Sequence, residues 1–303
     1  MKIATWNVNS VRRRTGNLLT WLQTARPDVV VLQELKAQEA QFPRLEVEAA
    51  GYKVEIVGQK GFNGVALLSL HPVEITARSL PDPETDEQAR YIEGKVQTPR
   101  GPLTVGGLYL PNGNPIHTDK FAYKIAWMDR LARRARCLLA QEEMFVLGGD
   151  YNVCPTDVDV FSPTAFANDA LCQPQSRQAL RALINLGLTD AVRAFHVEGP
   201  QYPFWDYRRA PGKRTTACGS TTCSCHPRPP TASLPSASTN RSAAVPNPPT
   251  TCPSGANWTS ADDNRVRRQR DTVSYYRAIG VHPKSEKMAR NADAIGIGGF
   301  SPP

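Results

Sequence analysis

The chain has 303 residues, enough for one large domain or two ordinary ones, and no apolar run is long enough to cross a membrane. It begins with a strand-like segment rather than the basic, apolar and small-residue regions of a secretory signal, so we expect a soluble, cytoplasmic protein. The formal net charge of +8 invites a nucleic-acid interpretation. However, residues 1–208 carry 23 Lys and Arg against 23 Asp and Glu, so all of the net charge lies after Arg208.

Residues 1–208 alternate short β-rich segments with helical patterns, which predicts a mixed α/β domain. Helices are expected at Val11–Ala25, at Lys120–Ala140 and at Ser176–Leu186, and Pro27 ends the first of these patterns. Several candidate polar groups follow strand-like runs, where loops at one edge of a sheet can form a site. Strands are expected at Lys2–Val8, Val29–Leu32, Lys53–Val57, Val65–Ser69, Tyr91–Val96, Leu103–Leu110 and Met144–Leu147.

The amino-acid composition and the hydrophobic pattern of the chain change after Arg208. Apolar periodicity is lost for roughly fifty residues, and segments such as Pro227–Pro235 and Asn247–Pro253 contain too much proline for internal strands or helices. This composition predicts a disordered tail over residues 209–303. A small zinc module made from the cysteines of this region is disfavoured, because no paired Cys-x-x-Cys spacing is present.

Four polar clusters end or follow strand-like runs of the first 208 residues. Taken alone, each has an ordinary structural explanation, such as a helix cap or a turn. Taken together they supply amide and carboxylate oxygens, which Mg²⁺ and Mn²⁺ prefer, and one phenol. That combination suits phosphodiester hydrolysis, in which a metal ion neutralises phosphate charge and a carboxylate orients or deprotonates the attacking water. The clusters are Asn7–Ser10, Gln33–Lys36, Tyr109–Gly113 and Gly148–Asn152.

Six segments that follow one another along residues 1–208 extend this pattern. They are Met1–Ser10, Leu32–Glu34, Gly58–Ala66, Tyr109–Gly113, Gly149–Asn152 and Phe204–Arg208. Together they resemble the exonuclease III type of abasic-site endonuclease, within the larger endonuclease/exonuclease/phosphatase superfamily. The Gly-Gln-Lys-Gly block and the Trp-Asp-Tyr-Arg segment favour the DNA-repair branch over the lipid and inositol phosphatases of that superfamily. The resemblance implies a single-domain, four-layer α/β sandwich of two packed mixed β-sheets flanked by helices.

The resemblance also implies a role for each matching residue. Glu34 would be the main metal ligand, beside Asn7, and Asp150 would act on the attacking water and join them at the metal. Asn152 would bind the metal or the phosphate oxygens that gain charge in the transition state, and Tyr109 would contact the same phosphate or help the leaving group. The expected DNA contacts are Arg90, Lys120, Lys124, Arg177 and Trp205, the last lining a pocket for a base-free sugar. A solvated basic helix face explains the two lysines as well, and a core tryptophan is the alternative for the last residue.

Two expected motifs are missing from the printed chain. Family members continue after Trp-Asp-Tyr-Arg with a segment ending in Arg-Ile-Asp-His and finish with Ser-Asp-His before a last strand, and neither is present. The final His is expected to pair with an Asp and to serve at the scissile phosphate, so its absence predicts a loss of orders of magnitude in rate.

Both motifs reappear when the codons are read one nucleotide out of register. Ala210–Cys223 can be the shifted reading of Gly-Ala-Trp-Gln-Lys-Asn-Asn-Gly-Leu-Arg-Ile-Asp-His-Leu, and Pro248–Gly255 that of Pro-Ser-Asp-His-Val-Pro-Val-Trp. In the shifted frame, the codons of Thr221-Thr222 and of Thr250-Thr251 would each encode an Asp-His pair. We hypothesise a single-nucleotide frameshift near Arg208, arising either from a sequencing error or in a genuine pseudogene.

The sequence therefore predicts a Mg²⁺- or Mn²⁺-dependent nuclease of base excision repair. It would act as a monomer on duplex DNA with abasic sites or 3′ ends. In the printed form, residues 1–208 would be an incomplete domain that has lost the last strands of its second sheet. Two alternatives remain open: a catalytically dead homologue with residual DNA or metal binding, and a superfamily phosphodiesterase that acts on a small phosphate ester.

Overall fold

The computed structural model describes residues 1–81, 86–99, 101–160, 162–195 and 277–279, all of which belong to one compact unit. Among these residues, no helix combines the length and the hydropathy needed to span a bilayer. The helices are α1 (Val11–Ala25), α2 (Arg44–Ala49), α3 (Asp119–Ala140), α4 (Pro174–Ile184) and α5 (Ala191–Phe195), with short 3-10 turns η1 (Glu39–Gln41) and η2 (Asp157–Asp159).

Nine described strands form two mixed sheets. The first sheet has the order β1-β2-β4-β3 and the second has the order β5-β6-β7-β8-β9. In each sheet one neighbouring pair is parallel, β1 with β2 and β7 with β8, and the other neighbours are antiparallel. The strands are β1 (Ile3–Asn7), β2 (Val29–Gln33), β3 (Lys53–Val57), β4 (Val65–Ser69), β5 (Val73–Ala77), β6 (Tyr91–Thr98), β7 (Gly101–Tyr109), β8 (Phe145–Asp150) and β9 (Arg277–Ile279).

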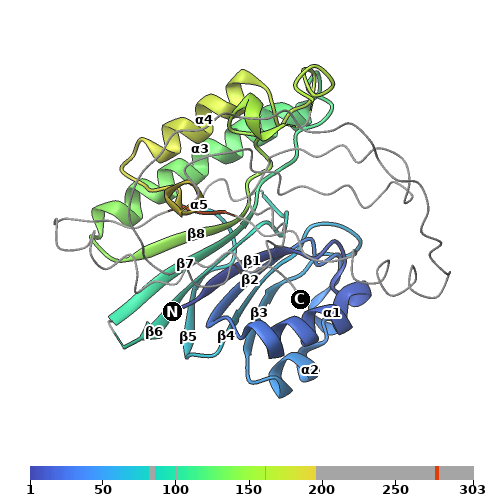
Figure 1. Ribbon diagram of the computed structural model, residues 1–303, viewed down its shortest axis with the longest axis vertical. Helices are drawn as coiled ribbons and strands as arrows, with labels where there is room; N and C mark the ends of the chain where they lie inside the picture. Colours follow the sequence, from blue (N-terminus) through green and yellow to red (C-terminus); the bar gives the residue numbers. More distant parts are fainter. Residues whose placement is uncertain (82–85, 100, 161, 196–276, 280–303) are drawn as a thin grey trace, which may run out of the picture. The chain divides into compact units, whose positions relative to one another are not determined.

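The sheets pack face to face, and each is covered on its outer face by helices (Figure 1). Alternation along β2 shows how the layers form. Val29 and Val31 join the apolar cluster between the sheets, whereas Val30 and Leu32 join the cluster beneath α1 and α2. A third cluster packs α3 and α4 on the outer face of the second sheet. The predicted four-layer α/β sandwich is therefore confirmed.

The parallel pairs place functional side chains at one edge of each sheet. Asn7 lies opposite Gln33 at the ends of β1 and β2, and Tyr109 lies opposite Asp150 at the ends of β7 and β8. Because parallel strands end on the same side, the loops that follow them gather there. The two sheets thus bring together the ends of β1, β2, β7 and β8.

The predicted helices and strands all occur, with boundaries that differ by up to three residues. Besides β9 and the 3-10 turns η1 and η2, three short elements were not predicted: β5, α2 and α5. The tail expected over residues 209–303 lies outside the described residues except for Arg277–Ile279, which forms β9 and pairs antiparallel with β8 over Leu147–Gly149. Within the described structure the second sheet therefore continues beyond β8 by this one strand of three residues. The loss of the last strands of the family fold stays a prediction.

Candidate active site

Asn7 joins the carboxylates of the two sheets. Its side-chain amide donates to Glu34 Oε1 at 2.8 Å and to Asp150 Oδ2 at 3.0 Å. Asn7 Oδ1 accepts the backbone N–H of Asn9 at 3.1 Å, which fixes the orientation of the amide. The last residue of β1 thus holds a carboxylate from the loop after β2 beside a carboxylate at the end of β8.

Glu34 remains an ionised acceptor although it is largely buried. Burial opposes the charged form, but hydrogen bonds from Asn7 and Lys36 outweigh it and lower the pKa of Glu34. Its side chain keeps 19% of its surface exposed, so a small cation can reach it. The backbone of Glu34 has φ +54°, a left-handed conformation stabilised where Ser10 N–H donates to the Glu34 carbonyl at 2.8 Å.

Asp150 is buried, with 4% of its surface exposed. Burial raises the pKa of this carboxyl to about 6, while hydrogen bonds from Asn7 and from the backbone of Asn152 act in the opposite direction. The Asn152 N–H donates to Asp150 Oδ1 at 3.0 Å. The carboxyl is therefore charged at neutral pH and poised to accept a proton just below it.

Tyr109 completes the cluster from the end of β7. Its phenol donates to Glu34 Oε1 at 2.9 Å. Burial and the negative charges of Glu34 and Asp150 hold the pKa of Tyr109 well above 10, so the phenol stays a neutral donor. The Arg90 guanidinium lies over the Tyr109 ring at 4.9 Å and donates to the Tyr109 carbonyl at 3.2 Å. Arg90 thus supports the phenol from one face of the ring.

Lys36 also belongs to the cluster, although the sequence did not single it out. Its ammonium lies 2.7 Å from Glu34 Oε2 and donates to Asn9 Oδ1 at 2.5 Å. Lys36 adopts φ +51°, so the chain turns back and the side chain reaches the residue two positions earlier. The Gln33–Lys36 cluster contained this lysine, but its spacing alone does not reveal the left-handed turn.

Asn152 is buried and adopts a left-handed conformation with φ +45°. Its amide donates to the Leu110 carbonyl at 2.7 Å, and its Oδ1 lies 3.4 Å from the Asn112 amide nitrogen. The expected roles of Asn152 at a metal ion or a phosphate remain predictions. Its contacts connect the loop after β8 to the loop after β7.

The expected DNA contacts occupy different environments. Lys120 is exposed at the start of α3, as a phosphate contact requires. Lys124 is fully buried and donates to backbone carbonyls, so it is neither a surface phosphate contact nor part of a solvated helix face, and both interpretations are wrong for this residue. Arg177 donates to the Cys154 carbonyl at 2.9 Å and to Asp157 at 2.8 Å. Trp205 lies outside the described residues.

The donor set suits a hard divalent cation. Glu34 and Asp150 supply carboxylate oxygens, which are linked through the amide nitrogen of Asn7. The amide oxygen of Asn7 accepts the Asn9 N–H, and that of Asn152 lies beside Asn112. The described part of the chain contains no group of three or more His, Cys, Asp or Glu residues arranged to hold a metal ion. The fit therefore depends on two carboxylates and their neighbouring amides rather than on a closed ligand cage.

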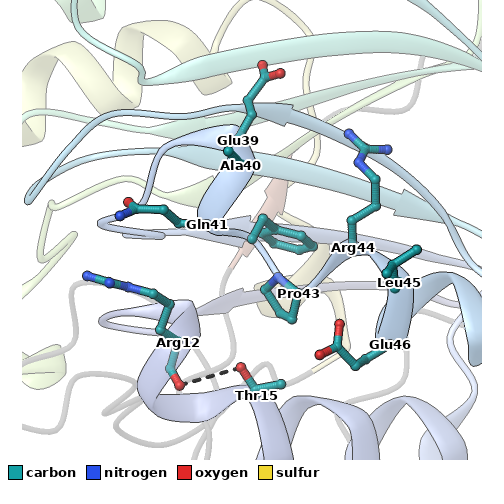
Figure 2. Close-up of a pocket in the computed structure, with 10 residues that line it drawn as sticks. Arg12, Thr15, Glu39, Ala40, Gln41, Pro43, Arg44, Leu45 and Glu46 are labelled. Carbon is teal, nitrogen blue, oxygen red and sulfur yellow. Dashed lines mark hydrogen bonds between the residues drawn. The ribbon is translucent and has the colours of Figure 1, made fainter.

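A separate pocket of about 640 Å³ lies between the start of α1 and the η1–α2 segment (Figure 2). Arg12 and Thr15 line it from α1, facing Gln41 and Pro43, and Glu46 lines it from α2. None of the predicted site residues lines this pocket. We therefore place the candidate chemistry at the strand ends, where the titratable groups converge.

Comparisons with known proteins agree with this fold. A family model described as "Endonuclease/Exonuclease/phosphatase family" matches residues 4–234. Exodeoxyribonuclease III of Haemophilus influenzae is 30% identical over 216 residues, which cover 69% of this chain and 81% of that protein. An AP endonuclease structure from Archaeoglobus fulgidus is 33% identical with a TM-score of 0.64, covering 71% of this chain and 84% of its own. The structure of a 3′ phosphatase from Neisseria, bound to a product DNA hairpin, is 34% identical with a TM-score of 0.62. The match covers 69% of this chain and 79% of that chain.

The chain therefore belongs to the endonuclease/exonuclease/phosphatase family. Within it, the chain is a member of the exonuclease III and AP endonuclease group, as its motifs predicted. By family it is a hydrolase of the kind that acts on DNA phosphodiester bonds.

Proposed function

We propose that this protein is a DNA repair nuclease that hydrolyses phosphodiester bonds at abasic sites and at 3′ ends of duplex DNA, with Mg²⁺ or Mn²⁺ as cofactor. The observation that carries the proposal is the Asn7, Glu34, Tyr109 and Asp150 cluster at the ends of two parallel strand pairs. The names of the relatives, exodeoxyribonuclease III, AP endonuclease and 3′ phosphatase, support the substrate class.

Each residue of the cluster would have its own role in the hydrolysis. Glu34 and Asn7, with Asp150 and Asn152, would hold the cation, which when bound would neutralise charge on the phosphate. Asp150, which is charged at neutral pH, would orient an attacking water and accept its proton. Tyr109 stays protonated and would donate to a phosphate oxygen. The exposed Lys120 would contact the DNA backbone, and so would the guanidinium of Arg90, which lies over the Tyr109 ring.

We propose further that the family sequence of the printed chain is incomplete after about Arg208, because the codons beyond it are read in a shifted frame. The absent Arg-Ile-Asp-His and Ser-Asp-His motifs support this proposal. The printed protein would then be a weak or inactive cytoplasmic monomer, and restoring one nucleotide would restore cleavage.

The first experiment measures Mg²⁺-dependent cleavage of a duplex with one abasic-site analogue by the printed protein, by a frame-restored version and by restored Glu34→Ala. Cleavage by the restored protein alone supports both the nuclease and the frameshift. Restored Glu39→Ala is the matched control, since that exposed glutamate lies five positions away and outside the cluster, and it should cut normally.

Other outcomes separate the alternatives. Equal cleavage by the printed protein would contradict our account of the missing motifs, and an intact frame on both DNA strands across Arg208 would exclude a sequencing error. Hydrolysis of a small phosphodiester such as bis(4-nitrophenyl) phosphate, without cleavage of the DNA, would favour the small-ester alternative.

A further inference from the structure

Lys124 is a buried lysine without a role in the chemistry described above. It has no exposed surface and lies on the buried face of α3 together with Trp127 and Met128. Its ammonium donates to the carbonyls of Asn112 at 3.0 Å, Asn152 at 2.6 Å and Ala170 at 3.2 Å. All three of its hydrogens can therefore be used by backbone oxygens.

Such a group is expensive to bury. Removing an ammonium from water is strongly unfavourable unless hydrogen bonds and charges replace its hydration shell. The packing around Lys124 is close, since a Cβ built on Gly113 would lie 2.6 Å from Lys124 Cδ. Gly113 also has φ +90°, so the loop passes the lysine stem at a position suited to glycine.

The three acceptor carbonyls belong to three different loops. Asn112 follows β7 and the phenol of Tyr109, Asn152 follows β8 and the carboxyl of Asp150, and Ala170 precedes α4. Asn152 reaches its acceptor position through a left-handed backbone and uses its own N–H to bind Asp150 Oδ1. A shift of the Asn152 backbone would therefore move a hydrogen bond that orients Asp150.

We propose that Lys124 is a positioning residue that ties the loops carrying Asn112, Asn152 and Ala170 into one arrangement and thereby orients Asp150. It acts through the backbone and does not touch DNA. The inference rests on the proposed nuclease function for its consequence in catalysis, but not for the structural tie itself. It also replaces the DNA-contact role that the sequence suggested for this lysine.

The structural tie is tested by amide hydrogen exchange of the full chain as printed, comparing wild type with Lys124→Met, which keeps the length of the side chain. Peptides covering residues 110–115, 150–154 and 168–173 should exchange about tenfold faster or more in the variant, and peptides from β2 and β4 should not change. Ser176→Ala is the matched control, because this buried hydroxyl donates to the same Ala170 carbonyl at 2.7 Å. It should affect residues 168–173 alone. Unchanged exchange at residues 150–154 in Lys124→Met would overturn the proposal.

The catalytic consequence is tested in whichever form of the protein cleaves DNA. Lys124→Met should lower kcat by roughly 10- to 100-fold with KM and the salt dependence unchanged, as expected for a group that orients another. Lys120→Met, one helical turn away and exposed, should instead raise KM and reduce the slope of log affinity against log salt by about 1. A reduced salt slope for Lys124→Met would restore the DNA-contact interpretation and overturn ours.

A third measurement needs no variant and so covers the case in which Lys124→Met does not fold. Amine acetylation of the native full chain, followed by mass spectrometry, should modify Lys120 readily and Lys124 only after unfolding. Equal labelling of the two lysines would overturn the proposal. If no form of the protein cuts DNA, the proposed function fails, while the exchange and labelling results still decide the role of Lys124 in the loops.

Discussion

The Asn7 side-chain amide donates to Asp150 Oδ2 at 3.0 Å, a contact between residues 143 positions apart that joins β1 of one sheet to β8 of the other. The same amide nitrogen donates to Glu34 Oε1 at 2.8 Å. Two carboxylates at this distance from one donor repel each other unless a cation lies near them. Asn7 is thus the neutral link that lets the two sheets present their carboxylates to one site.

Replacing Asn7 with Ala should weaken catalysis and shift its pH dependence. The hydrogen bond from Asn7 lowers the pKa of Asp150, so its loss raises that pKa. We expect kcat to fall by roughly 10- to 100-fold, as for other groups that orient a catalytic carboxylate. The acid limb of the pH–rate profile should move to higher pH. Asn17→Ala, an asparagine on α1 outside the cluster, is the control, and an unmoved acid limb in Asn7→Ala would contradict the assignment.

Asp150 should make the metal-free protein less stable as pH rises. Its pKa is raised by burial from 3.8 to about 6, so the folded state holds a proton that the unfolded state releases between these values. The stabilisation is full below pH 3.8 and is lost as pH rises through 6. Relative to Asp150→Ala, the wild type should lose up to about 3 kcal/mol of unfolding free energy across this window. Urea unfolding without metal measures the difference, and Mg²⁺ should reduce it; a difference that does not vary with pH would refute the prediction.

Glu34 behaves in the opposite way. Its pKa is lowered below 4.5 because hydrogen bonds from Asn7 and Lys36 outweigh the effect of burial. The resulting stabilisation is present above pH 4.5 and is lost as pH falls through the pKa of the folded state. Lys36→Met should therefore be less stable than wild type at pH 6, and this deficit should shrink toward pH 3. Lys53→Met, an exposed lysine on β3, is the control. A deficit of constant size would show that the lysine acts through packing instead.

The site was predictable in outline because its residues directly follow strands. Glu34 and Asp150 are far apart in the sequence, yet each ends or follows the second strand of a parallel pair, and the structure brings both to Asn7. Lys36 was missed because its approach depends on a left-handed turn, which residue spacing does not encode. Trp205 lies outside the described residues, so its role remains a prediction.

The burial of Lys124 could have been predicted from the helical periodicity of the sequence. Trp127, Met128 and Leu131 follow it by three, four and seven positions, and all three are buried, so helical periodicity places the lysine on the core face of α3. Strand β5 also left a signal, since Val73, Ile75 and Ala77 alternate with polar residues, although its edge position leaves those side chains only half-buried. Helix α2 has six residues, too few for a clear period.

Gly149 should be the glycine of this site that tolerates alanine least. It lies beside Asp150 at φ +153°, and an added Cβ would approach the Leu108 carbonyl oxygen to 1.9 Å. The obstacle is the backbone of the neighbouring strand, so no side-chain rotation relieves it, and β8 must move away from β7. Gly149→Ala should therefore lose more than about 3 kcal/mol of unfolding free energy, or fail to fold.

Gly61→Ala is the matched comparison for this substitution. Gly61 also has a positive φ, +82°, but no heavy atom lies within 4 Å of an added Cβ. Only the left-handed backbone then opposes alanine, at a cost of about 1–2 kcal/mol. Urea unfolding of both variants separates the steric effect from the conformational one. Similar losses for the two would mean that β8 can move away from β7, and the Asp150 carboxyl would then not be held as rigidly as its hydrogen bonds to Asn7 and Asn152 imply.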